Sequence, residues 1–127
     1  MTGFFILSHE RIAAISRLFQ IRYNFTALLQ RSRQVLHAGR GQRIRLLHAS
    51  PQGVWTRVFQ EDPDQKLQAM FANTDFTGYE GAPDIVAYGD IHEAFVRTFE
   101  RKTLLNVGSV GNPLDQPLAC YAMLEGS

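Results

Sequence analysis

The residues best suited to chemistry lie at positions 89–92, where the sequence Gly-Asp-Ile-His follows the apolar run Ile-Val-Ala-Tyr. Alternate residues of an extended segment project to the same side, so Asp90 and His92 could direct their side chains at one ion. A carboxylate oxygen and an imidazole nitrogen together suit Zn, Mn or Fe. Because an isolated Asp-X-His is more often part of an ordinary loop, this pair needs support from neighbouring motifs.

Two further motifs place polar residues directly after apolar runs. His48 follows Leu-Leu and precedes Ala-Ser-Pro, and Asn106 opens the sequence Asn-Val-Gly-Ser-Val-Gly. Taken alone, His48 would be a buried, hydrogen-bonded histidine. Asn106 is expected to shape a tight turn, because asparagine bonds the local backbone and glycine permits positive φ. Ser109 is not expected to be a nucleophile, since it lacks a strand-turn-helix setting.

Together, the three motifs resemble the C-terminal half of the calcineurin-like metallophosphoesterases, particularly the small bacterial phosphodiesterase-type members. In that family a His-Gly-Ser-Pro segment, a Gly-His-Thr-His block and an Asn-Pro-Gly-Ser-Val-Gly turn follow in this order. Here the matching segments are residues 48–51, 89–92 and 106–111. The resemblance covers about residues 43–125, and three linked motifs are more specific than any one of them.

The resemblance implies metal ligands. His48, Asp90 and His92 match positions that bind divalent metal in the family, where the centre is dinuclear, and Mn, Zn or Fe is the expected ion. Asp90 stands where the family usually has histidine. A carboxylate can still bind such an ion, but its negative charge would oppose an anionic substrate nearby.

The upstream metal-binding blocks of the family do not occur before His48. Without their carboxylates, one copy of the chain cannot complete a two-metal site that activates a bridging water. We therefore expect a metal-dependent phosphoesterase for a small phosphomonoester or phosphodiester, truncated and poorly active without an N-terminal half. The alternative is a non-catalytic remnant that binds a partner or forms a homo-oligomer through apolar surface, such as that of Ile85, Val86 and Leu105.

Composition indicates one globular domain over residues 1–127, since 45% of the 127 residues are hydrophobic. Residues 1–50 carry eight arginines against Glu10 alone, whereas residues 51–127 carry five basic and eleven acidic side chains. Such a basic half can bind nucleic acid, but its arginines are dispersed, so nucleic acid is not the expected partner. No segment resembles a signal peptide or membrane span, and the single Cys120, in an apolar run, predicts a buried thiol and a cytoplasmic protein.

The expected fold is α/β, a partial metallophosphoesterase-type sandwich in which a mixed sheet has flanking helices. Helices are predicted at residues 8–20, at 21–33 and at about 62–73, where Asp62, Pro63 and Gln65 would form a capping box and three apolar side chains would share one face. Strands are predicted at residues 35–36, 44–47 and 85–88, and a hairpin at residues 94–107. Trp55 and Phe59 are interpreted as packing residues.

Overall fold

Two sheets and one short helical segment make up the described part of the protein. The computed structural model describes residues 2–7, 34–37 and 41–124, and the side chains of residues 41–122. A five-stranded sheet has the order β2-β3-β4-β6-β5, and a two-stranded sheet pairs β1 with β7. The elements are β1 (Thr2–Leu7), β2 (Gln34–His37), β3 (Arg43–Leu46), α3 (Asp64–Gln68), η2 (Ala69–Phe71), β4 (Ile85–Tyr88), β5 (Ala94–Phe99), β6 (Lys102–Val107) and β7 (Ala119–Leu124). The helices predicted at residues 8–20 and 21–33 lie outside the described residues.

The large sheet is mixed, as predicted. β3, β4 and β6 are parallel neighbours, whereas β2 and β5 run antiparallel at the two edges. The central strand β4 is a continuous apolar run of the kind that a sheet covered on both faces requires. Because they are parallel, their carboxyl ends lie at the same edge of the sheet, which is where open α/β folds place ligands.

Both predicted strand pairings are confirmed. The first joins β2 to β3 across residues 38–42, and the second joins β5 to β6 through a two-residue turn. Glu100 in that turn has a φ of 51°, as tight hairpin turns demand. These pairings fix the register of the sheet and therefore the position of each strand end.

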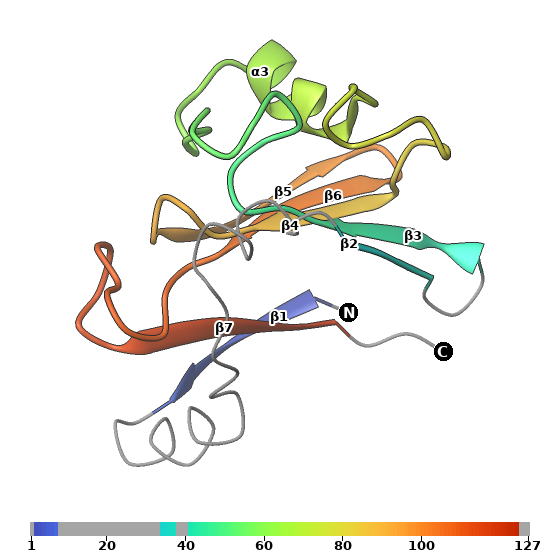
Figure 1. The fold of residues 1–127 in the computed structure, drawn as a ribbon. Helices are drawn as coiled ribbons and strands as arrows, with labels where there is room; N and C mark the ends of the chain where they lie inside the picture. The colour runs from blue at the N-terminus through green and yellow to red at the C-terminus, as the bar shows by residue number, and fades with distance from the viewer. Residues whose placement is uncertain (1, 8–33, 38–40, 125–127) are drawn as a thin grey trace, which may run out of the picture.

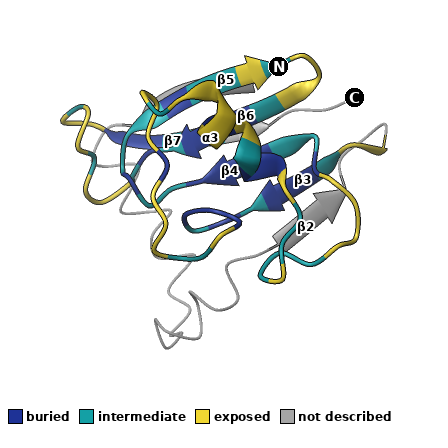
Figure 2. Ribbon diagram, turned by 90° about the horizontal axis from the view of Figure 1, so that it is seen from above, coloured by how far each residue is buried: buried dark blue, intermediate teal, exposed yellow. Residues whose placement is uncertain are grey.

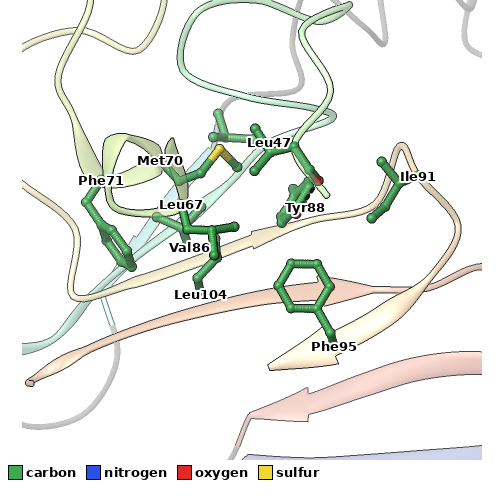
Figure 3. Packing of buried hydrophobic residues seen from close by; sticks show 10 residues of the cluster. Leu47, Leu67, Met70, Phe71, Val86, Tyr88, Ile91, Phe95 and Leu104 are labelled. Atoms are coloured by element: carbon green, nitrogen blue, oxygen red, sulfur yellow. Dashed lines mark hydrogen bonds between the residues drawn. The ribbon is translucent and has the colours of Figure 1, made fainter. Parts of the chain in front are cut away.

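One face of the large sheet is covered by α3 and η2 (Figure 1). Leu67, Met70 and Phe71 share one face and are buried there, as predicted, against β4 and β6 (Figure 3). The outer side of α3 is exposed, whereas β4 beneath it is buried (Figure 2). This layer is the hydrophobic core.

The predicted capping box is wrong. Pro63 is the N-cap residue and makes no side-chain capping bond. The Asp62 carboxylate accepts a hydrogen bond from the Phe59 backbone N–H and pairs with Lys66. The helix is also shorter than predicted, since α3 ends at Gln68 and the 3₁₀ turn ends at Phe71.

The opposite side of the large sheet carries β1 and β7 (Figure 1), which the apolar pattern had not identified as strands. The Cys120 N–H donates to the Ser109 carbonyl at 2.9 Å, and Cys120 is a buried free thiol, as predicted. A Cβ atom on Gly108 would lie 2.8 Å from the Cβ of Cys120, so this approach of β7 requires glycine.

The apolar surface expected at Ile85, Val86 and Leu105 is largely covered in the described part of the chain. Val86 and Leu105 are both fully buried, and only Ile85 is half-buried. The side chains of Val86 and Leu105 point to opposite faces of the sheet, because they occupy alternating positions in the register. The chain therefore covers both faces of β4 and β6 itself. No helix among the described residues is long and apolar enough to cross a membrane.

Candidate functional site

An open hollow of about 460 Å³ lies where the parallel strands end. It is formed by the last residues of β3, β4 and β6 and by the turns that follow them. The residues that line it are Leu46, Leu47, His48, Ala87, Tyr88, Gly89, Val107, Gly108, Ser109 and Val110.

His48 lies two residues beyond the end of β3, as predicted, and lines the hollow. Its carbonyl accepts a hydrogen bond from the Gly89 N–H at 3.2 Å. This bond extends the parallel pairing past the ends of β3 and β4. It places His48 beside the segment that carries Asp90.

Asp90 follows β4 and is almost completely buried, with 4% of its side chain exposed. Its Oδ2 lies 3.8 Å from Nε of Arg57, while its Oδ1 is buried with no hydrogen-bond partner in the described part of the chain. Burial raises the pKa of the Asp90 carboxyl, and the positive charges of His48, Arg57 and His92 oppose that rise. Both histidines therefore lie within electrostatic reach of a carboxylate that lacks a full set of partners.

His92 is held in an uncommon backbone conformation, with a φ of 60°. Its Nδ1 lies 2.8 Å from the Asn112 carbonyl oxygen, and its own carbonyl accepts from the Leu114 N–H. A carbonyl can only accept, so Nδ1 carries the proton and Nε2 of the neutral ring is left with a lone pair. A histidine oriented in this way by a carbonyl is typical of metal ligands.

Asn106 shapes the turn after β6, as predicted. Its Oδ1 accepts a hydrogen bond from the Gly108 N–H at 3.0 Å, and Gly108 has a φ of 70°. Its Nδ2 is buried without a hydrogen-bond partner among the described residues, although it lies close enough to the Tyr88 hydroxyl to oppose the rise in that phenol's pKa. Ser109 accepts from the Asn112 N–H through Oγ, which links this turn to the loop that orients His92.

The donor types fit a divalent metal, but the arrangement is incomplete. Two imidazoles and one carboxylate with an unpaired oxygen suit Mn, Zn or Fe. Within residues 41–122, however, no three His, Cys, Asp or Glu side chains are grouped closely enough to hold one ion. The assignment of His48, Asp90 and His92 as a joint ligand set stays a prediction.

Three residues in the segment 55–59 were missed or misread from sequence. Trp55 is 77% exposed and Phe59 is 37% exposed, so the interpretation of both as packing residues is wrong. Arg57, between them, contacts the candidate ligand Asp90. The alternation of Trp55, Arg57 and Phe59 shortly after His48 was the signal that could have identified them.

A comparison with protein families adds an independent finding. The family model described as the calcineurin-like phosphoesterase superfamily domain matches residues 14–127, which is most of the chain and more than the three motifs span. No curated protein matches the chain. On the strength of the motifs, the mixed sheet and this match, the chain belongs to the calcineurin-like phosphoesterase superfamily.

Proposed function

We propose that this chain binds a divalent metal ion through His48, Asp90 and His92 and contributes it to the hydrolysis of a small phosphate ester. Within residues 41–122 the three side chains are not grouped closely enough to hold one ion as they lie, so binding would have to draw them together. The observation that carries the proposal is the unpaired, buried Oδ1 of Asp90. A buried polar atom without a partner costs about 1–3 kcal/mol, and more when it is charged. A cation at this atom would remove that cost.

Each side chain would have its own role. Asp90 would supply the charge that balances the ion, and the two histidines would supply neutral nitrogen ligands. The Asn112 carbonyl would hold the His92 ring in the tautomer that frees Nε2. A bound metal of this kind polarises a phosphate oxygen and lowers the pKa of a bound water.

Three protein ligands leave coordination positions open for water or substrate, unlike the four of a structural zinc site. A second ion would need ligands beyond these three, since the upstream family blocks are absent from the sequence. We therefore expect weak metal binding. We also expect the chain alone to hydrolyse an aryl phosphodiester no faster than metal in buffer.

Calorimetric titration with MnCl₂ and ZnCl₂ tests the metal site. His48→Ala, His92→Ala and the near-isosteric Asp90→Asn should each weaken binding about tenfold or more, the loss typical when groups of a metal site are removed. Asp75→Asn is the matched control, because Asp75 is an exposed carboxylate bonded to Tyr79. Tight binding that survives all three site substitutions would show that the metal binds elsewhere.

The alternative function is association with a partner or a second copy. The surface that favours it is not that of Ile85, Val86 and Leu105. Val110, Leu114 and Leu118 are 49%, 65% and 42% exposed on the connection between β6 and β7. Exposed apolar side chains gathered on one loop favour association. Light scattering of the chain and of Leu114→Ser compares the two cases: a dimer that the substitution dissociates would support the alternative, and a monomer would contradict it.

A further inference from the structure

We infer that Trp55, Arg57 and Phe59 form a binding stripe beside Asp90 that takes phosphate esters whose organic part is a flat aromatic or heteroaromatic ring. The inference rests on the proposed function for the position of the phosphate. The stripe itself depends on separate observations. They are the exposure of the three side chains, the anchoring of their backbone and the contact of Arg57 with Asp90.

All three side chains are exposed, whereas Val58, between Arg57 and Phe59, points inward. Trp55 is 77% exposed, the Arg57 side chain 65% and Phe59 37%, whereas Val58 is 1% exposed and packs in the core. The Val58 carbonyl accepts the Tyr88 hydroxyl at 2.6 Å, which fixes this strand-like segment against β4. Arg57 and Phe59 lie two apart in a segment without turn or helix and so share a side, and Trp55 is the exposed last residue of the turn that precedes this segment.

The stripe is anchored at both ends. Before it, Ser50 and Gly53 exchange two backbone hydrogen bonds, and the Thr74 hydroxyl donates to the Pro51 carbonyl at 2.6 Å. After it, the Asp62 carboxylate accepts the Phe59 N–H at 2.8 Å. A ligand would meet side chains on an ordered backbone, which lowers the entropic cost of binding.

Arg57 links the stripe to the candidate metal edge. Its Nε lies 3.8 Å from Asp90, and its other guanidinium nitrogens have no partner among residues 41–122. A guanidinium with free N–H groups binds phosphate oxygens in a bidentate manner. The charge of an ester phosphate would therefore be met at Arg57, two residues along the chain from Trp55.

Trp55 would meet the organic part of the ligand. Exposed indole rings stack on flat rings, and one such stack contributes about 1–3 kcal/mol in single-stranded nucleic acid complexes. A lone exposed aromatic needs no special explanation. Here two aromatics flank a cation that contacts a buried carboxylate, and this combination suits a ligand with both a ring and a negative charge.

Fluorescence titration of the full chain tests the stripe, because Trp55 is the only tryptophan. The probes are AMP, ribose 5-phosphate and inorganic phosphate. We expect AMP to change the Trp55 emission saturably and ribose 5-phosphate, which lacks the ring, to bind about tenfold more weakly. Equal affinity for AMP and ribose 5-phosphate would overturn the inference.

Calorimetry of variants tests the roles of Trp55 and Arg57 separately. Trp55→Leu should weaken AMP about tenfold and leave ribose 5-phosphate unchanged, whereas Arg57→Gln should weaken both. Tyr79→Leu is the control, since Tyr79 is equally exposed at 70% on another loop. Unchanged AMP affinity in Trp55→Leu would contradict the stripe.

The AMP titration is carried out in EDTA and again with Mn²⁺. A ring preference in EDTA from a chain that binds no Mn²⁺ would retain the stripe and reject the metal proposal. Mn²⁺ binding without a ring preference would reject the stripe and retain the metal proposal. The two failures are therefore distinguishable.

Discussion

The two regions that share β4 differ in how fully their groups are paired. Under α3 and η2, Leu67, Met70 and Val86 are completely buried among apolar neighbours. At the carboxyl edge, a few residues further along the chain, the Oδ1 of Asp90 and the Nδ2 of Asn106 are buried without hydrogen bonds among the described residues. The first region stabilises the fold, and the second holds polar groups that a ligand could satisfy.

A third unpaired atom, the Nε of Arg45, lies at the border of the helical layer. Arg45 differs from the edge residues, because its terminal nitrogens bond the Ala72 carbonyl and the Asn73 side chain at 2.7 and 2.6 Å. Those bonds tie β3 to the segment after η2. The other two unpaired buried side-chain atoms within residues 41–122 both lie at the carboxyl edge, which is the pattern expected of a functional edge.

The contrast between the two regions predicts the largest loss of stability when a cavity is created in the apolar region. Leu67→Ala should lower the free energy of unfolding by about 2–5 kcal/mol, because Leu67 is fully buried and its neighbours are fixed on β4 and β6. Urea denaturation followed by circular dichroism measures this loss. Leu114→Ala, at a side chain 65% exposed, should change stability by less than about 0.5 kcal/mol.

Tyr88 lies between the two regions. Tyr88→Phe should lower the free energy of unfolding by about 1 kcal/mol at pH 7, since the Val58 carbonyl loses its donor.

Burial raises the pKa of the Tyr88 phenol above its ordinary 10.0. Above that pH the unfolded chain releases the proton while the folded chain keeps it. Stability should therefore fall as the pH rises past about 10, and more steeply than in Tyr88→Phe.

Tyr79→Phe serves as the control for the pH titration, because it removes an exposed hydroxyl, bonded to Asp75, in place of a buried one. An identical slope in wild type and Tyr88→Phe, measured by urea denaturation between pH 8 and about 11, would show that the Tyr88 phenol ionises as freely in the folded chain as in the unfolded one.

The smallest effect on stability is expected at Arg57. Its ion pair with Asp90 is long and its side chain is 65% exposed, so Arg57→Gln should change the free energy of unfolding by less than about 1 kcal/mol. Mn²⁺ affinity should instead rise severalfold, because the ion no longer competes with the guanidinium for Asp90. A weaker Mn²⁺ affinity in Arg57→Gln, measured by calorimetry, would contradict this competition.

Local patterns predicted most of the described strands. The continuous apolar run of β4 and the turn residues between β5 and β6 are short-range signals, and both were interpreted correctly. The capping at Asp62 was wrong, because its carboxylate bonds Phe59 and Lys66 instead of the helix start. β1 and β7 were missed, since their pairing joins the two ends of the chain.

The site was predictable in its residue types but not in its surroundings. The sequence by itself determined the order of His48, Asp90 and His92 after apolar runs, and with it the family, because motif spacing is written along the chain. Only the tertiary structure decided that Asp90 is buried beside Arg57 and that Trp55 faces solvent. Burial and charge pairing depend on which strands become neighbours, and that is set by packing between segments far apart in sequence.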